Sequence, residues 1–215
     1  FGLYEFGASK AWENNTIRYN ISQNDGIING GSIGIWKNEN RGVMKNCKIY
    51  NNTFYNSLEE GTSIWLYDNY PGFSFYNNVF VYGKSFLSGE SEIKDEVFLG
   101  NLYWNLTGDE SMEGYKNLKA WAAAKGKEFK ERKFVGVYAN PEFYAPGVLN
   151  LTNPSQINRE NLFGYIPKIG SPLIDKGLNL TTLFKINIGN IDITGEKIPA
   201  NDFYDIGAIE YIESN

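Results

Sequence analysis

Apolar and polar positions repeat in the first half of the chain as a short phrase that occurs four times. The copies read IRYNIS (17–22), IYNNTF (49–54), FYNNVF (75–80) and FLGNLY (98–103). In each copy an apolar residue stands three positions before an asparagine, and a second β-prone run follows. Columns that recur in this way are typical of a solenoid whose units pack on one another. Because the units are β-prone, the pattern predicts a β-solenoid.

The repeated asparagines predict a buried ladder. They are spaced unevenly, by 32, 26 and 23 residues, as loops of different length between coils would allow. Rungs stacked about 4.8 Å apart would let each side-chain amide bond the next one. Asparagine also tolerates left-handed backbone angles, so we expect the bend between two strands at the ladder residue itself. The ladder column is Asn20, Asn52, Asn78 and Asn101, and the core column is Ile17, Ile49, Phe75 and Phe98.

A third strand is expected between successive copies of the phrase. The candidates are GLYEFG (2–7), SIGIWKN (32–38), SIWLYDN (63–69) and KSFLSG (84–89). Three parallel strands per coil define an all-β fold, the parallel β-helix, whose stacked coils share one continuous core. A β-sandwich would have a similar composition but would not explain the aligned columns. We therefore expect residues 1–105 to form the coils.

Residues 106–133 change to helical spacing. Asp109 or Ser111 would cap the start of a helix, and Gly126 would end it. We expect this amphipathic helix to be an insertion packed on the solenoid, rather than a segment that binds a membrane or a partner. The apolar residues on its predicted face are Tyr115, Leu118, Trp121 and Ala122.

Residues 134–215 are punctuated by prolines and predict an irregular end of the same domain. The apolar stretch YDIGAIEY (204–211) is expected to form a closing strand. Asp175, Asp192 and Asp205 flank turns and glycines without the D-x-D-x-D-G spacing of a calcium loop. We interpret these three aspartates as turn caps.

Composition then excludes several function classes. The chain carries 20 Lys and Arg against 25 Asp and Glu, without a basic run, so we expect no nucleic-acid partner. No apolar run approaches the ~18 residues of a membrane span, so we expect no membrane insertion. The absence of histidine removes histidine-based catalysis and histidine metal ligands. The lone Cys47 is expected to be buried in a strand. No metal and no cofactor are predicted.

Several longer motifs carry a family resemblance. In chain order they are NNTIRYNISQNDG (14–26), the YNNTFYN and FYNNVF repeats, NPEF (140–143), GSPLIDKG (170–177), DITGEKIP (192–199) and DIGAIEY (205–211). Together they resemble bacterial secreted right-handed parallel β-helix proteins, which occur among polysaccharide lyases and glycoside hydrolases. The resemblance implies a secreted or cell-surface bacterial protein whose partner is an oligosaccharide or polysaccharide. It is specific for the fold and less so for the chemistry, because one fold hosts many activities.

The first coil is expected to need a cover. Phe1 already lies in a predicted strand, and an open coil would expose both its core and its backbone edge. We therefore expect preceding coils of the same protein, or a second chain, at this end. The resemblance implies an aspartate-rich strand there, followed directly by LYEFG (3–7).

The third-strand column contains candidate catalytic carboxylates. Aligning YEF (4–6), WKN (36–38) and YDN (67–69) places Glu5, Lys37 and Asp68 on successive rungs. The two carboxylates would then be roughly 9.6 Å apart at the backbone, near the upper end of the separation in inverting glycosidases. Lys37 between them would keep one carboxylate ionised while the other stays protonated. The alternative is a surface charge ladder that stabilises the sheet weakly.

Neighbouring residues would bind substrate. Trp36, Trp65 and Tyr67 offer flat faces for sugar rings, and Lys37, Asn38 and Asn69 offer hydrogen bonds. Asp25, which opens a glycine-rich loop, is a third catalytic candidate, with an Asx-turn cap as the alternative. The sequence thus favours a glycoside hydrolase that uses paired carboxylates. The alternatives are a polysaccharide lyase and a non-catalytic glycan-binding or structural module.

Overall fold

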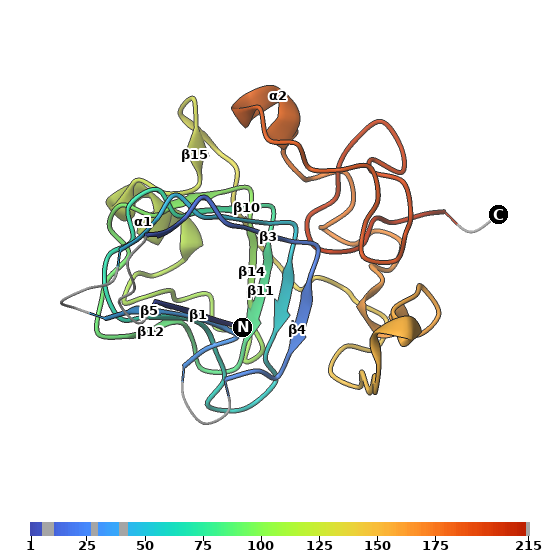
Figure 1. Cartoon of the computed structure of the whole chain (residues 1–215), viewed down its shortest axis with the longest axis horizontal. Helices are drawn as coiled ribbons and strands as arrows, with labels where there is room; N and C mark the ends of the chain where they lie inside the picture. The colour runs from blue at the N-terminus through green and yellow to red at the C-terminus, as the bar shows by residue number, and fades with distance from the viewer. Residues whose placement is uncertain (6–10, 27–29, 39–42, 214–215) are drawn as a thin grey trace.

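The protein folds as a right-handed parallel β-helix in a computed structural model that describes residues 1–5, 11–26, 30–38 and 43–213 (Figure 1). The predicted fold class is therefore confirmed. Residues 6 and 7 of the first expected strand, and residues 27–29 of the loop after Asp25, lie outside the described residues.

Three parallel sheets run along the solenoid, with one strand of each sheet per coil. The first sheet contains β1 (Gly2–Glu5), β5 (Ile33–Lys37), β9 (Thr62–Leu66) and β12 (Ser85–Gly89). The second sheet contains β3 (Thr16–Arg18), β7 (Lys48–Tyr50), β10 (Ser74–Tyr76) and β13 (Val97–Leu99). The third sheet contains β4 (Ile21–Gln23), β8 (Thr53–Tyr55), β11 (Val79–Tyr82), β14 (Leu102–Asn105) and β17 (Val137–Tyr138).

Two further strand pairs are short. The parallel pair is β2 (Trp12–Glu13) with β6 (Met44–Lys45), and the antiparallel pair is β15 (Phe129–Lys130) with β16 (Lys133–Phe134). Cys47 is buried as expected but precedes β7, so its predicted place in a strand is wrong.

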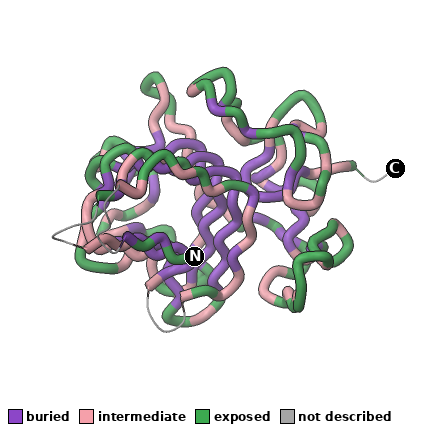
Figure 2. Tube along the Cα trace, viewed as in Figure 1, coloured by how far each residue is buried: buried purple, intermediate pink, exposed green. Residues whose placement is uncertain are grey.

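The strand register confirms the predicted core column. Ile17 pairs with Ile49, Ile49 with Phe75, and Phe75 with Phe98. The rings of Phe75 and Phe98 stack with centroids 4.4 Å apart and an interplanar angle of 5°. Each coil thus covers the apolar side chains of the next coil. Figure 2 shows the buried residues as continuous stretches along the stacked strands.

The asparagine ladder is also confirmed. The side-chain amide of Asn20 donates to Oδ1 of Asn52 at 2.9 Å, Asn52 donates to Asn78 at 2.9 Å, and Asn78 donates to Asn101 at 3.1 Å. In each step the backbone N–H of the donor residue bonds the same oxygen, at 2.9–3.0 Å. Asn52, Asn78 and Asn101 are fully buried. The ladder therefore satisfies polar groups inside the solenoid that no water reaches.

The bend between strands lies one residue before the ladder position, so its prediction at the ladder asparagine is wrong. At these bends the residues with left-handed backbone are Tyr19 (φ 51°), Asn51 (φ 50°), Asn77 (φ 50°) and Gly100 (φ 70°). Asn51 and Asn77 also hold the C-terminal segment, because their amides donate to the carbonyls of Asp205 at 3.2 Å and Leu178 at 2.9 Å. In each Asn-Asn pair the first residue bends the chain, and the second builds the ladder.

Helix α1 (Leu118–Lys125) begins later than predicted. Its cap is Asn117, whose Oδ1 accepts a backbone N–H of the first turn at 2.9 Å. Asp109 and Ser111, the predicted caps, bond each other at 2.7 Å in a separate turn. Left-handed backbone at Glu113 (φ 49°) prevents the helix from starting there. Gly126 ends the helix with φ 67°, as predicted.

The apolar face of α1 packs on the solenoid core. Leu118, Trp121 and Ala122 are buried, as expected. The Trp121 ring contacts Phe98 and Tyr103 of the last full coil, with centroids 6.2 Å apart in both cases. The helix therefore covers the core at the C-terminal end of the coils. No helix among the described residues is long and apolar enough to cross a membrane.

The C-terminal segment lies on the outer face of the third sheet (orange and red beside β4 and β11 in Figure 1). Its helical turns are η1 (Pro154–Gln156), η2 (Phe163–Tyr165) and α2 (Leu180–Phe184). Sheet residues Val79 and Leu102 share an apolar cluster with tail residues Phe143, Tyr165 and Ile206. The third sheet is therefore buried on both faces, as parallel sheets usually are.

Residues 204–211 do not form the predicted closing strand. Tyr204 makes one isolated bridge with Gly177, and no strand follows. The reason is that carboxylates take the local N–H groups: Glu210 N–H donates to Asp192 at 2.9 Å, and Tyr211 N–H donates to Asp205 at 2.6 Å. Asp192 also caps its own turn as predicted, because its Oδ1 accepts from the N–H groups of Thr194 at 2.7 Å and Glu196 at 3.0 Å.

Replacing Asn78 by Leu should destabilise the protein by about 1–3 kcal/mol, because both donors of Asn52 lose their acceptor. Equilibrium urea unfolding measures this loss. The matched control is Asn190→Leu at an exposed position, which should stay within about 0.5 kcal/mol of the parent protein. An unchanged unfolding midpoint for Asn78→Leu would contradict the ladder's role.

Candidate functional site

Four aromatic residues lie together on the outer face of the first sheet. Strand alternation places Tyr4, Trp36 and Trp65 opposite the core residues of their strands, and Tyr67 directly follows β9, where its N–H donates to the Ile35 carbonyl at 3.2 Å. Tyr4 pairs with Trp36 across β1 and β5. The Tyr67 ring lies 6.0 Å from that of Trp36 and 6.1 Å from that of Trp65. We call these four residues the aromatic face.

Glycines form the floor of the aromatic face. Gly34 pairs with Gly2 on one side and with Trp65 on the other. A Cβ at Gly34 would lie 3.3 Å from the Tyr4 hydroxyl and 3.6 Å from the Trp65 ring, and a Cβ at Gly2 would collide with the Tyr4 ring. The glycines therefore let the rings lie close to the sheet. Tyr4 is 46% exposed, which leaves part of this surface open to solvent.

The predicted charge column is present at the ends of the same strands. Glu5 pairs with Lys37, and Nζ of Lys37 lies 2.7 Å from Oδ2 of Asp68. The two carboxylates differ in environment, because Glu5 is 8% exposed on the core side of β1 whereas the Asp68 side chain is 43% exposed. Alternation places Glu5 on the core side of β1 with Leu3, whereas Lys37 and Asp68 lie at the ends of the strands and reach solvent beside the aromatic face.

The Lys37–Asp68 pair controls the charge of Asp68. The hydrogen bond from Lys37, helped by the backbone N–H of Asn69 at 2.7 Å, holds the pKa of Asp68 below its usual range. Asp68 is therefore ionised at neutral pH and suits a hydrogen-bond acceptor or a base. Glycoside hydrolysis uses a pair of carboxyl groups, and the second carboxyl of this column is Glu5.

The two predicted asparagines have structural bonds. The Asn69 amide donates to Asp95 at 2.5 Å and accepts from the Asp95 N–H at 3.3 Å, which links two successive coils. The backbone N–H of Asn38 donates to the Glu5 carbonyl at 2.8 Å and continues the pairing of β1 with β5. Both residues border the charge column.

Asp25 lies apart from the other candidates. Its carboxylate accepts from the Ser22 hydroxyl at 2.6 Å and lies 3.8 Å from the Phe1 amino group. Glu5 is four residues along the extended strand from Phe1, which is about 13 Å at roughly 3.3 Å per residue. The structure therefore brings Glu5, Lys37 and Asp68 together but not Asp25.

Sequence reasoning missed two members of this region. Tyr4 was recognisable by its alternation with the apolar Leu3. Asp95 has no such signal, because its contact with Asn69 depends on how the coils stack. Within the described part of the chain, no cluster of three or more Cys, Asp or Glu side chains could hold a metal ion.

No protein-family model matches this chain, and the search of curated proteins finds no match either. The function is therefore inferred from the fold and from the geometry of this surface.

Proposed function

We propose that this protein binds a glycan on its aromatic face and acts as part of a carbohydrate-active β-helix protein. The observation that carries the proposal is the row of rings from Tyr4 to Trp65, which lies across successive strands on a floor of glycine. Rungs about 4.8 Å apart present one flat ring after another, a spacing comparable with successive sugar rings in a chain. The apolar C–H faces of sugars pack on such surfaces.

The rim of the aromatic face supplies polar contacts. The side chains of Lys37 and Asp68 are 21% and 43% exposed, and both would bond sugar hydroxyls through charge-assisted hydrogen bonds. The net charge of −5 and the absence of a basic stripe favour a neutral glycan over an acidic one. This charge balance supports a hydrolase more than a polysaccharide lyase, which would have to neutralise an acidic sugar.

Hydrolysis is the second candidate function, favoured by two carboxylates on rungs that flank Lys37. In this proposal Asp68 is the ionised carboxylate, and Glu5 is the second carboxyl of the pair. Strands β1, β3 and β4 are all edge strands at one end of the solenoid, which supports a neighbouring coil of the same protein or of a second chain there. We further propose that the protein is bacterial and secreted or on the cell surface, where such glycans occur.

Trp36→Ala and Tyr67→Ala should each weaken oligosaccharide binding by about tenfold or more, because each variant removes one stacking ring. Isothermal titration calorimetry against a panel of neutral and acidic oligosaccharides measures this effect, with thermal unfolding as the check on folding. The matched control is Phe203→Ala, which removes a ring that is 63% exposed on the C-terminal segment. Equal losses in all three variants, or no binding of any glycan by the parent protein, would refute the proposal.

Asp68→Asn separates binding from catalysis. If Asp68 only binds the glycan, binding should weaken by roughly 1–3 kcal/mol through loss of a charged hydrogen bond, with turnover of any cleaved substrate largely retained. A loss of turnover of about a thousandfold or more would assign Asp68 a catalytic role, equivalent to over ~4 kcal/mol of transition-state stabilisation. No change in binding or turnover would place the glycan elsewhere.

A further inference from the structure

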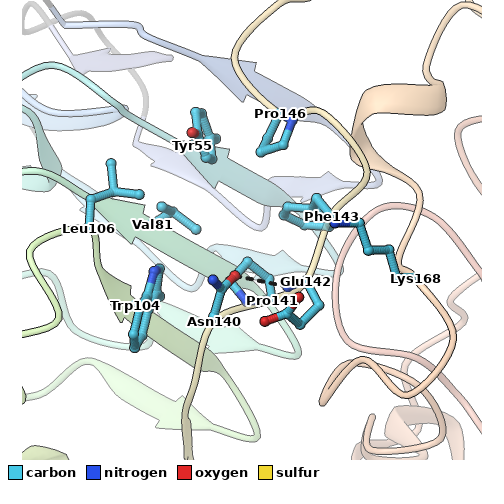
Figure 3. Close-up of a pocket in the computed structure, with 10 residues that line it drawn as sticks. All are labelled: Tyr55, Val81, Trp104, Leu106, Asn140, Pro141, Glu142, Phe143, Pro146 and Lys168. Atoms are coloured by element: carbon cyan, nitrogen blue, oxygen red, sulfur yellow. Dashed lines mark hydrogen bonds between the residues drawn. The ribbon is translucent and has the colours of Figure 1, made fainter.

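A second surface with ligand-binding character lies where the third sheet meets the C-terminal segment (Figure 3). It is a cavity of about 240 Å³, and none of its residues belongs to the aromatic face. Its floor is formed by Tyr55, Val81 and Trp104, which pair in register on β8, β11 and β14. Asn140, Glu142 and Lys168 line it from the segment that follows β17.

The floor contains two aromatic rings, one on each side of the aliphatic Val81. Two rungs place the backbones of Tyr55 and Trp104 roughly 9.6 Å apart, with Val81 between them. Tyr55 packs edge-on against Tyr165 with centroids 5.8 Å apart, and the Trp104 ring lies 5.6 Å from that of Tyr138. These contacts hold both rings in place before any ligand arrives. The floor is therefore preorganised for a small ring with an apolar face.

The opposite wall presents hydrogen-bonding groups from a strained turn. Glu142 has left-handed backbone with φ 52°, a conformation that costs free energy for any residue with a Cβ. Its N–H donates to Oδ1 of Asn140 at 3.0 Å, and its carbonyl accepts from the Lys168 N–H at 2.8 Å. These bonds fix the backbone and leave the exposed carboxylate at the cavity rim (Figure 3). The turn is therefore held in one conformation beside the cavity.

We propose that this cavity is a separate subsite that binds one uncharged sugar ring. The C–H face of the sugar packs on the half-buried Trp104 ring, and neighbouring hydroxyls donate to the Glu142 carboxylate and bond the Asn140 amide. The cavity lies below the range of about 300–1,000 Å³ that suits drug-sized ligands, so it fits a single ring rather than a chain. Glu142 and Lys168 carry opposite charges, which favours a neutral ligand over an ion. The inference goes beyond the proposed function, because the subsite is independent of the aromatic face.

The test titrates a panel of neutral monosaccharides into the whole protein and follows the indole N–H signals of its tryptophans by NMR. We expect saturable shifts of the Trp104 signal with a dissociation constant on the order of 1 mM. Glu142→Gln should weaken binding at least tenfold, while the control Glu160→Gln, at another exposed carboxylate, should leave it unchanged. No shift of the Trp104 signal with any sugar, or equal binding by both variants, overturns the proposal.

Glu142→Gly distinguishes a binding role from a structural one. Glycine adopts φ 52° without strain, so this variant should unfold at the same or a higher temperature while losing sugar binding at least tenfold. A lower unfolding temperature with retained binding would show that Glu142 only stabilises the turn. Trp36→Ala should leave monosaccharide binding at the cavity intact, so failure of the aromatic face and failure of this subsite are told apart.

Discussion

Glu128→Leu should destabilise the protein by roughly 3–5 kcal/mol, because this buried carboxylate ends the asparagine ladder. Oε1 of Glu128 accepts from the Asn101 amide and from the Tyr103 hydroxyl, both at 2.7 Å. Oε2 accepts from the Gly100 N–H at 2.6 Å. Leucine would leave all three donors buried without an acceptor. Equilibrium urea unfolding at constant pH measures the loss.

Two variants control this measurement. Glu128→Gln keeps one acceptor oxygen but places an NH₂ group among donors, so its loss should be smaller than that of Glu128→Leu. Glu110→Leu changes an exposed glutamate and should alter the free energy of unfolding by less than about 0.5 kcal/mol. A Glu128→Leu protein as stable as the Gln variant would mean that the ladder needs no terminal acceptor.

The free energy of unfolding should decrease as the pH rises from about 5 to about 8. Burial raises the pKa of Glu210 to about 8, with help from the charge of Asp205. Burial also raises the pKa of Asp205 to about 6 and that of Glu128 to about 7. All three carboxyls therefore keep a proton in the folded state at pH values where the unfolded chain has lost it.

The direction follows from this difference in bound protons. Stability changes with pH in proportion to the protons bound by the unfolded state minus those bound by the folded state. That difference is negative between the ordinary pKa of each group and its raised pKa. Stability is therefore fully present below the ordinary values and declines up to the raised ones. The slope is about 1.4 kcal/mol per pH unit for each group, so Glu210 alone contributes on the order of 3–4 kcal/mol across this range.

Urea unfolding at several pH values between about 5 and about 8 checks the expectation. Glu210→Gln removes the carboxyl group with the most raised pKa. The free energy of unfolding of this variant should therefore decline less steeply with pH than that of the parent protein. The exposed Glu160→Gln variant should keep the parent slope. Rising stability over this range, or identical slopes for parent and Glu210→Gln, would contradict the assignment.

The coils were predictable because their pattern is local in the sequence. In each copy the core residue stands three positions before the ladder asparagine. Aligning the copies is therefore enough to place Ile49 next to Phe75 and Asn52 next to Asn78 in neighbouring coils. The bend was misplaced because IYNNTF contains two adjacent asparagines that both tolerate left-handed angles. Gly100 stands where Asn51 and Asn77 stand in their coils, and this exchange of asparagine for glycine marks the left-handed position.

The remaining features depend on contacts between distant parts of the chain. Glu128 reaches Asn101 only after α1 has crossed the end of the coils, and Lys168 reaches Glu142 only after the tail has folded back. No periodicity in the sequence encodes either contact. The column of Glu5, Lys37 and Asp68 was predictable from alignment, and the burial of Glu5 on the side of Leu3 follows from strand alternation. The functional roles of these residues remain predictions.

The direction of the asparagine ladder limits how the length of this solenoid can evolve. In the bonds between ladder side chains, each amide donates toward higher residue numbers, and the ionised Glu128 carboxylate at the end of the series only accepts. A duplicated coil with an asparagine in this column fits anywhere before Glu128, since it accepts from one neighbour and donates to the other. A coil placed after Glu128 would meet an acceptor where it needs a donor. Variants gained by duplication should therefore differ in their number of asparagine rungs and share the acidic residue that ends the series.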